Sequence, residues 1–335
     1  MAVLSLRGAL DEVRHVDHHA HALLREPPHD LNAFRGLFSE SPDPAQWPHV
    51  ATAITYLRAI ELLGSHLGCE PDERAVFELR RRSDPGEYAS RLLRGSGATS
   101  ILIDTGFPQP EDALTVAQMG ALAGCPAHRV LRIESLSDSE LSGRIAGARG
   151  DGFVALKTIV AYRGGLDPET GDPATHDRLN RALEVNRDTG EPLPVQVHTG
   201  FGDPDLLLAR ADPSLLKPLI ERFAQTPFVL LHCYPFIREA GWLASVYPNV
   251  FFDLSLTIPH VARPNAVVAE ALELAPLSKL LYASDAVRTP ELYLLASIWW
   301  RDALAEALGS WLPQKAAIEG ARRVLCDNAT ELYRL

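Results

Sequence analysis

The sequence predicts an α/β fold, a closed (β/α)8 barrel of eight parallel strands with a helical insertion after the first strand. Three observations predict it. Eight short apolar segments rich in β-forming residues recur along the 335 residues, they end in polar residues, and helical periodicity fills most of the intervals between them. Alternating strands and helices are typical of a parallel sheet, and closure into a TIM barrel accounts for the count of eight.

The candidate strands are RHVDHHAH (14–21), ATSILIDTGF (98–107), HRVLRIES (128–135), GFVALKTI (152–159), LPVQVHTG (193–200), FVLLHCYP (228–235), NVFFDLSL (249–256) and KLLYASDA (279–286). Intervening segments such as THDRLNRALEVNRDTG have the apolar spacing of amphipathic helices. A doubly wound open sheet would alternate in the same way. That fold usually carries a glycine-rich phosphate turn after its first strand, and no such motif occurs here, so we rank it second.

The interval between the first two candidate strands is far longer than an ordinary barrel connection. HVATAITYLRAIELLGSHLG and DERAVFELRRRSD read as helices within it, with the turn-forming segments SPDPAQWP and CEPDE beside them. We interpret residues 28–95 as a helical cap inserted into a single domain that spans residues 1–335. Connections that follow strands gather at the catalytic mouth of a barrel, so the insertion either covers that mouth or packs against the outer wall.

Composition favours a globular protein that acts on a small molecule. Apolar residues make up 46% of the chain, charged residues make up 22%, and the mean hydropathy is -0.03, as in a protein with a large core. The net charge of -11 argues against a general nucleic-acid binder, which needs a basic surface. No run approaches the roughly 18 apolar residues of a membrane span, and the N-terminus lacks an export signal. We expect a cytoplasmic protein with no nucleic-acid or membrane partner, and the composition leaves a homo-oligomer open.

The four cysteines argue against a structural zinc knuckle and a disulfide framework. Cys69, Cys125, Cys233 and Cys326 are widely scattered, with no C-x-x-C pair, and we expect them to stay reduced. Cys233 directly follows His232, but adjacent strand residues face opposite ways. A cysteine nucleophile beside that histidine is therefore not favoured.

Histidines crowd the first candidate strand. In RHVDHHAHALL (14–24), strand geometry places Asp17, His19 and His21 on one face and His18 on the other. An H-x-H pair taken alone often occurs by chance, so residues elsewhere in the chain must decide whether this one has a function.

Polar residues stand at the carboxyl ends of further candidate strands. They are Lys157 on the fourth, His198 on the fifth, His232 on the sixth and Asp285 on the eighth. The carboxyl ends of barrel strands meet at one mouth, where active sites of this architecture lie, so we expect these side chains to converge with the first-strand histidines. Imidazole nitrogens and carboxylate oxygens suit a borderline divalent metal such as zinc.

This ordered set resembles the amidohydrolase superfamily of metal-dependent hydrolases, with D-x-H-x-H on the first strand, histidines on the fifth and sixth, and aspartate on the eighth. The resemblance spans nearly the whole chain. It implies that His19, His21, His198 and Asp285 hold a metal ion, while His232 joins a second metal or contacts the reacting water. The stretch LKTIVAYRGGLD (156–167) is also similar to the amidohydrolase module of FluG-type proteins.

Lys157 leaves the number of metal ions open. In two-metal amidohydrolases a lysine in this position reacts with carbon dioxide, and the resulting carbamate bridges two cations. An unmodified ammonium has no lone pair and cannot be a ligand. A salt bridge at the mouth and a contact with an anionic substrate are the alternatives, and together they have about the same weight as carboxylation. We therefore expect one Zn²⁺ ion, and a second only if Lys157 is carboxylated.

The catalytic roles follow from the metal. A bound zinc lowers the pKa of water to about 7. Asp285 could ligate the metal, accept the proton of the water and return it to a leaving amine, while His232 could polarise the carbonyl or orient the water. Capping of a following helix is the structural alternative for Asp285.

Arginines a few residues beyond the strand ends are candidates for binding the substrate. Arg163 and Arg288 could pair with an acidic substrate such as a γ-glutamyl compound, and solvent exposure is the alternative for either one. Arg238 and, on the second strand, Asp104 are weaker candidates of the same kind.

The leading prediction is an enzyme, a metal-dependent amidohydrolase that cleaves a C–N bond of a small molecule, with γ-glutamyl amides as one candidate class. A metal-dependent non-oxidative decarboxylase on a similar barrel site is the nearest alternative, and it would release carbon dioxide instead of an amine. A barrel that binds metal without catalysis is the third reading.

Overall fold

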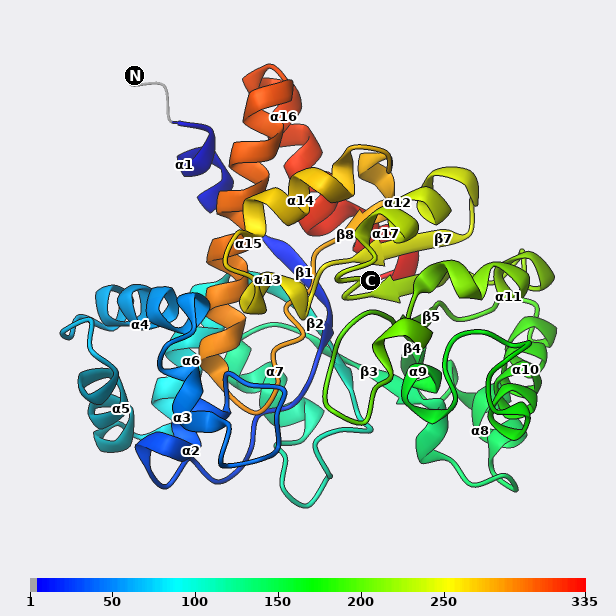
Figure 1. Ribbon diagram of the computed structural model, residues 1–335, viewed down its shortest axis with the longest axis horizontal. Coiled ribbons are helices and arrows are strands. Elements are labelled where there is room, and N and C mark those ends of the chain that lie inside the picture. The colour runs from blue at the N-terminus through cyan, green and yellow to red at the C-terminus, as the bar shows by residue number, and fades with distance from the viewer. Residues whose placement is uncertain (1–4) are drawn as a thin grey trace.

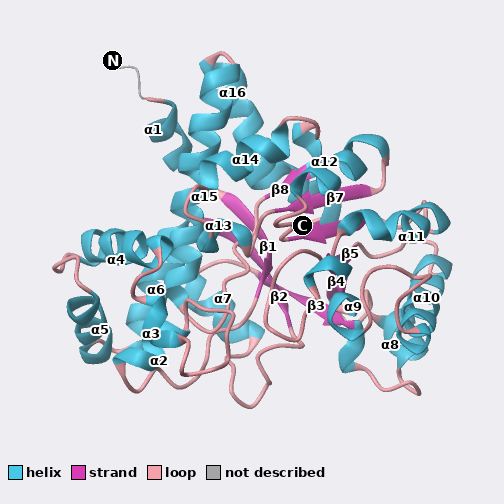
Figure 2. Cartoon of the chain, viewed as in Figure 1, coloured by secondary structure: helices cyan, strands magenta, loops and turns pink. Residues whose placement is uncertain are grey.

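Eight strands of the computed structural model, which describes residues 5–335, pair in parallel in the order β1 to β8 (Figures 1 and 2). The amide of His18 on the first strand donates to Tyr282 O at 3.4 Å, and the amide of Asp285 donates to His19 O at 3.0 Å. These bonds join the two edges of the sheet. The predicted (β/α)8 TIM barrel is therefore confirmed.

The strands are β1 (His15–Ala20), β2 (Ala98–Asp104), β3 (Ala127–Arg132), β4 (Phe153–Thr158), β5 (Val195–His198), β6 (Phe228–Leu231), β7 (Val250–Asp253) and β8 (Leu280–Leu281). Each overlaps its predicted segment, and β3 begins one residue before the prediction. Strands such as β6 are buried along their whole length, which explains why they read as apolar runs without alternation.

Helices cover the outside of the barrel (Figure 2). Polar side chains define where several of them begin, as where Asp172 accepts a hydrogen bond from the Thr175 amide and Thr115 forms a capping box with Gln118. Outside the insertion the helices are α1 (Leu6–Asp11), α7 (Val116–Ala123), α8 (Leu141–Gly147), α9 (Val160–Arg163), α10 (Pro173–Asp188), α11 (Lys217–Arg222), α12 (Ile237–Val246), α13 (Thr257–His260), α14 (Pro264–Leu272), α15 (Pro290–Trp311), α16 (Gln314–Arg322) and α17 (Asn328–Tyr333).

Five helices lie between β1 and β2. They are α2 (Leu31–Gly36), α3 (Trp47–Val50), α4 (Ile54–Leu67), α5 (Glu73–Arg82) and α6 (Pro85–Ser96). The last of them packs against α15, in the layer around the barrel, whereas α4 and α5 project to the left in Figure 1. Glu40, between α2 and α3, lines a cavity at the mouth of the barrel. The insertion thus contributes a side chain to that mouth.

The opposite end of the barrel is closed by an apolar layer that includes the C-terminal helix. Val16, Leu102, Val229 and Leu281 from the strands form one buried cluster with Tyr333 of α17. These side chains fill the bottom of the barrel, and the predicted site residues lie at the other end, around the cavity at the carboxyl ends of the strands.

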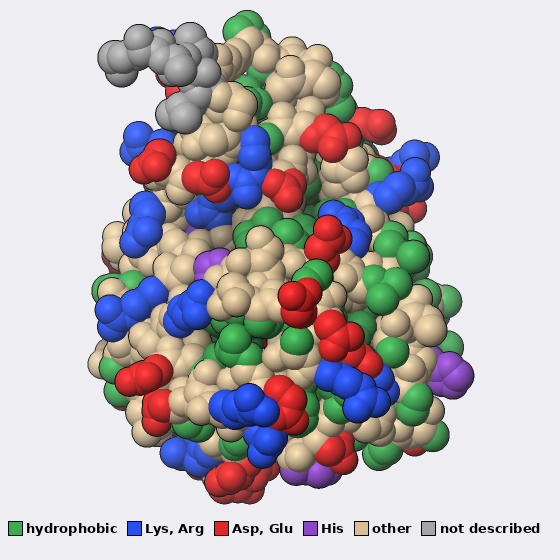
Figure 3. Space-filling view, turned by 90° about the vertical axis from the view of Figure 1, so that its left-hand side faces the viewer, with side chains coloured by type: hydrophobic (Ala, Val, Ile, Leu, Met, Phe, Trp, Pro, Cys, Tyr) green, Lys and Arg blue, Asp and Glu red, His purple; other side chains and the backbone are tan. Residues whose placement is uncertain are grey.

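The surface mixes charged and apolar side chains, as the face that carries the insertion shows in Figure 3. Isolated large apolar residues such as Ile54 and Leu57 on α4 are exposed there. Within residues 5–335, none of the helices has both the length and the apolar character that crossing a membrane requires.

Phe34 packs against other aromatic residues of the insertion, and we expect Phe34→Ala to lower the free energy of unfolding by about 3–5 kcal/mol. Its side chain is fully buried, with ring centroids 5.3 Å from Phe38 and 5.8 Å from Phe77. Urea unfolding followed by circular dichroism measures the change. Ile54→Ala removes an aliphatic side chain that is 58% exposed, so it should cost less than about 0.5 kcal/mol. Similar losses in the two variants would contradict this packing.

Candidate metal centre

The first strand departs from regular alternation where its histidines lie. His18 Nε2 lies 2.9 Å from Asp253 Oδ2, and His19 Nδ1 lies 2.9 Å from Gln196 Oε1, so both neighbours face side chains of other barrel strands. The register of β1 against β2 shifts between Asp17 and Ala20, which permits this arrangement. Asp17 instead accepts hydrogen bonds from the amide and hydroxyl of Ser284. The predicted placement of Asp17 with His19 and His21, and of His18 opposite them, is therefore wrong.

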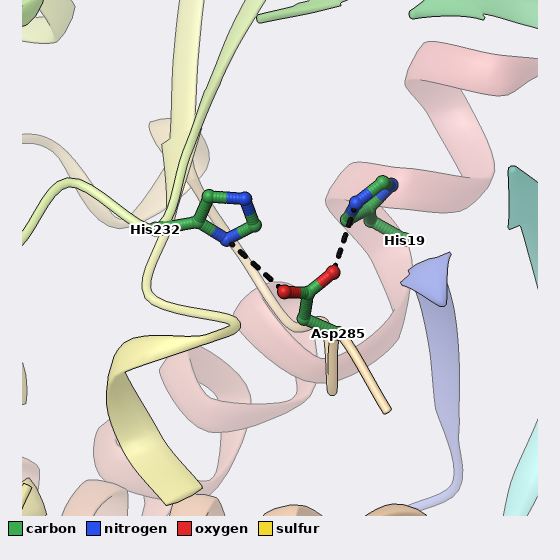
Figure 4. Close-up of side chains that lie close together, drawn as sticks. All are labelled: His19, His232 and Asp285. Carbon is green, nitrogen blue, oxygen red and sulfur yellow. Dashed lines mark ion pairs between the residues drawn. The ribbon is translucent and has the colours of Figure 1, made fainter. Parts of the chain in front are cut away.

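Three histidines converge on the carboxylate of Asp285. His19 Nε2 and His21 Nε2 lie 3.0 and 3.3 Å from its Oδ1, and His232 Nδ1 lies 3.7 Å from its Oδ2. Figure 4 shows His19 and His232 approaching the two oxygens from opposite sides. One ligand atom each from His19, His232 and Asp285 lies within 4.8 Å of the others, and could therefore share a cation.

Hydrogen bonds behind His19 and His21 fix which nitrogen faces Asp285. A carbonyl can only accept, so His21 Nδ1 donates to Phe107 O at 3.0 Å. The Gln196 amide nitrogen donates to His18 O at 2.7 Å, which leaves its oxygen to accept from His19 Nδ1. A neutral imidazole has one proton, so both Nε2 atoms present lone pairs to a carboxylate oxygen that itself has no hydrogen-bond partner. Both lone pairs therefore face the carboxylate that, with His19 and His232, forms the group of ligand atoms able to share a cation.

Burial keeps the surrounding imidazoles neutral. It lowers the pKa of His19 to about 4, with help from the Lys157 ammonium, and it holds the pKa values of His198 and His232 well below the usual range. Neutral imidazole is the form that binds metal, so these side chains are ready to ligate at neutral pH.

His198 and Lys157 lie beside this group, which itself contains His232 and neither of the predicted ligands His21 and His198. His198 Nε2 is buried without a hydrogen-bond partner, and its ring centroid lies 4.5 Å from that of His232. Lys157 Nζ lies 3.4 Å from His19 Nε2. Burial lowers the pKa of the Lys157 ammonium to about 8, although Asp104 and Asp285 oppose the shift.

The backbone around these ligands adopts conformations that side-chain-bearing residues rarely occupy. His232, Asp285 and Arg288 have φ values of 68°, 48° and 68°, all in the left-handed region. Packing and hydrogen bonds must hold them there: the His232 amide, for example, donates to Asp253 Oδ1 at 2.7 Å. Such conformations cluster at functional sites, which agrees with a catalytic role for this end of the barrel.

A cavity of about 550 Å³ opens over the centre. Every residue that the sequence predicts for catalysis, metal binding or substrate binding lines it: His19, His21, Lys157, Arg163, His198, His232, Asp285 and Arg288. The two weaker candidates do not. Arg238 is exposed and pairs with Glu270 at 2.7 Å, and Asp104 is buried beside Arg132.

Comparison with known proteins agrees with this geometry. The amidohydrolase family model matches residues 16–335. The chain belongs to the amidohydrolase family. Protein fluG of Emericella nidulans is 27% identical over 409 aligned residues, which cover 100% of this chain and 47% of the relative. The chain thus spans about half the length of that curated relative.

Solved structures resemble this amidohydrolase along its whole length. A crystal structure from Lactobacillus casei, assigned as a metal-dependent hydrolase, is 26% identical, covers 99% of this chain and 98% of its own, and superposes with a TM-score of 0.87. Uronate isomerase from Thermotoga maritima, at 15% identity, 98% and 96% coverage and a TM-score of 0.62, shares the fold alone. Together with the donor set around Asp285, these findings identify a metal-dependent hydrolase that uses a divalent ion.

The amidohydrolase cavity also contains polar residues that the sequence prediction missed. They are Glu40, Gln109, Arg132, Glu134, Ser135, Tyr162, Asp203 and Asp205. Glu134 could have been predicted from the sequence, because it stands at the carboxyl end of the third candidate strand. Its Oε1 accepts from Thr158 Oγ1 at 2.5 Å and from the Ile159 amide at 3.0 Å, while its buried Oε2 has no partner. Glu40 comes from the insertion, whose folding onto the mouth no local pattern indicates.

Gln196 orients the metal-facing imidazole of His19, and we expect Gln196→Leu to weaken metal binding about 10–100-fold. Leucine cannot accept the hydrogen bond from Nδ1, so the ring loses its fixed tautomer. Competition with a fluorescent zinc chelator measures the affinity. Gln196→Glu keeps an acceptor for His19 and should lose less affinity than Gln196→Leu; equal losses would show that the contact merely fills space.

Proposed function

We propose that this amidohydrolase uses Zn²⁺ to hydrolyse the C–N bond of a small amide, and that γ-glutamyl amides are its substrate class. The observation that carries the proposal is the position of Asp285. Its carboxylate lies among unprotonated histidine nitrogens and lines the cavity as well. One group can therefore hold the cation and exchange protons with a substrate.

His19, His21, His198 and Asp285 would hold the ion, and a set of imidazoles with one carboxylate and no thiolate suits zinc. When bound, the ion supplies Lewis acidity toward the amide carbonyl and lowers the pKa of water. A second ion would need Lys157 in its carboxylated form. The lowered pKa of Lys157 supports this option, because the neutral amine is the form that reacts with carbon dioxide.

Side chains of the cavity transfer the proton and orient the reacting groups. Asp285 accepts the proton of the attacking water and passes it to the amide nitrogen as that nitrogen leaves as an amine. His232 lies beside Asp285 and orients the water or the carbonyl. Its Nδ1 is 2.7 Å from Ser255 Oγ, and its carbonyl accepts from Thr257 Oγ1 at 2.7 Å, so the ring has little freedom to move.

Two buried atoms in the cavity wall support an amino-acid substrate. Glu134 Oε2 is an acceptor and Arg288 Nε is a donor, and neither has a hydrogen-bond partner. Buried polar atoms rarely stay unpaired, so a ligand that brings an ammonium and a carboxylate would satisfy both. The amino-acid end of a γ-glutamyl amide carries these two groups, and Arg163 lies in the same wall.

We propose that the protein acts in the cytoplasm. All four cysteines are unpaired, which is typical of a reducing cytoplasm and supports action on a cytoplasmic small molecule. No nucleic acid, membrane or further subunit enters the proposed reaction.

Turnover of L-γ-glutamyl-p-nitroanilide by the zinc-loaded protein tests the proposal. We expect p-nitroaniline and glutamate in equal amounts, followed by absorbance and chromatography. Release of carbon dioxide without amine across a panel of amides and aromatic acids would identify a decarboxylase instead. Binding without turnover across that panel would identify a non-catalytic metal protein, and either result would overturn the proposal.

Glu134→Gln should raise KM about 10–100-fold for the γ-glutamyl substrate, since a hydrogen bond to a charged group contributes roughly 1.5–3 kcal/mol. Steady-state kinetics on the p-nitroanilide measures this. The matched substrate is glutaryl-p-nitroanilide, which lacks the ammonium and should show little change in KM. A similar rise for both substrates would contradict recognition of the ammonium by Glu134.

A further inference from the structure

A second cavity of about 410 Å³ lies where the insertion meets the barrel. Its walls come from the segment after β1, from α5, α6 and α7, and from the segment after β8. Most of the lining is apolar, including Leu23, Phe77, Leu114 and Leu122. Its size and its largely apolar lining with a few polar groups are typical of small-molecule sites.

The charged residues that line this cavity are all arginines. Four arginines line it, and among residues 5–335 no aspartate or glutamate does, although the whole chain has a net charge of -11. Arg80 pairs with Glu291, and Arg81 pairs with Glu78 at 2.8 Å. The guanidinium of Arg25 has no hydrogen-bond or ion-pair partner in residues 5–335, so its charge is free to meet a ligand.

We propose that this second cavity binds an apolar carboxylate, a small molecule with an aromatic or branched aliphatic body and a single carboxyl group. Burial of the apolar body against the leucines and Phe77 removes apolar surface from water. The carboxylate then pairs with a guanidinium at the rim, which offers two parallel N–H donors. An amine would face the arginines instead, and an uncharged molecule would gain no ion pair with Arg25.

The active-site cavity differs in chemistry, because Glu40, Glu134 and Asp203 line it. The two cavities share one wall residue, Arg288, which also bridges to Leu23 through the backbone. A ligand in the second cavity therefore contacts the wall of the first without reaching the metal ligands.

Calorimetric titration of the zinc-loaded chain, residues 1–335, with 4-phenylbutyrate tests the proposal. We expect one molecule bound per chain, and binding at least about 10-fold weaker for 4-phenylbutan-1-ol and 4-phenylbutylamine, which keep the apolar body and change the charged end. Equal binding of the acid and the alcohol, or no binding of the acid, would overturn the proposal.

Substitutions in the lining of the second cavity test whether the acid binds there. Arg25→Gln should weaken binding about 10-fold, whereas Arg74→Gln, an exposed arginine on α5 that does not line the cavity, should have no effect. Ala121→Trp, which points bulk into the cavity from α7, should abolish binding while the unfolding temperature stays unchanged. Removal of zinc should leave the affinity unaltered. Binding lost with the zinc, or retained in a tryptophan variant of normal stability, would place the acid elsewhere and overturn the proposal.

Discussion

The His19→Ala/His21→Ala variant should purify without bound metal and lose at least about 10³-fold in hydrolytic rate. These two imidazoles present bare Nε2 atoms to Asp285 Oδ1 at 3.0 and 3.3 Å, so their removal takes away half of the proposed ligands. The Lewis acidity of a bound ion stabilises the transition state by several kcal/mol, and each 1.36 kcal/mol is a tenfold change in rate.

Elemental analysis of protein purified without chelator measures the metal content of this variant. The matched control is His29→Ala/His49→Ala, which removes two exposed histidines from the segment between β1 and β2 and should keep a full complement of metal. Circular dichroism should show that both variants fold. Equal metal in the wild-type protein and the His19→Ala/His21→Ala variant would mean that the ion binds elsewhere, and the site as described would fail.

The sequence was sufficient to predict the barrel and most of its mouth. Apolar runs that end in Lys157, His198 or Asp285 carry two signals at once, because the run predicts a buried strand and the final residue marks its carboxyl end. Parallel strands bring those ends together whatever the loops do. Residues far apart in the chain could therefore be assigned to one cavity before any distance was known.

The rest depended on three-dimensional packing that no local pattern encodes. The register shift in β1 turned His18 toward Asp253, because a strand with an irregularity no longer alternates strictly. Gln196 looked like an ordinary strand residue, and only its contacts reveal that it orients His19. Glu40 reaches the mouth through the fold of an insertion, whose position relative to the barrel the sequence left open.

These contacts explain how a crowded set of like groups can be stable. His19, His21, His198 and Asp285 are all buried, so their lone pairs and the carboxylate charge need a partner within the protein or a bound cation. Acceptors behind the rings of His19 and His21 hold the tautomers that point these lone pairs inward, and the Lys157 ammonium lies 3.4 Å from one of them, His19 Nε2. The protein is thus organised in advance for a cation, and the cost is met by the folded barrel around the site.

Asp285→Asn should lower kcat about 10²–10⁴-fold, the range that loss of a general base produces, while more metal is retained than in the double histidine variant. The asparagine keeps the size of the side chain and one oxygen for the ion, but its amide cannot take the proton of the attacking water. Zinc content and steady-state kinetics on L-γ-glutamyl-p-nitroanilide separate the two effects. Asp203→Asn makes the same chemical change at a carboxylate of the same cavity that is not among the proposed ligands, and should alter kcat by less than about tenfold. A kcat within about threefold of wild type in zinc-bound Asp285→Asn would mean that another side chain transfers the proton. His232 would then be the next candidate, because its Nδ1 lies 3.7 Å from the same carboxylate.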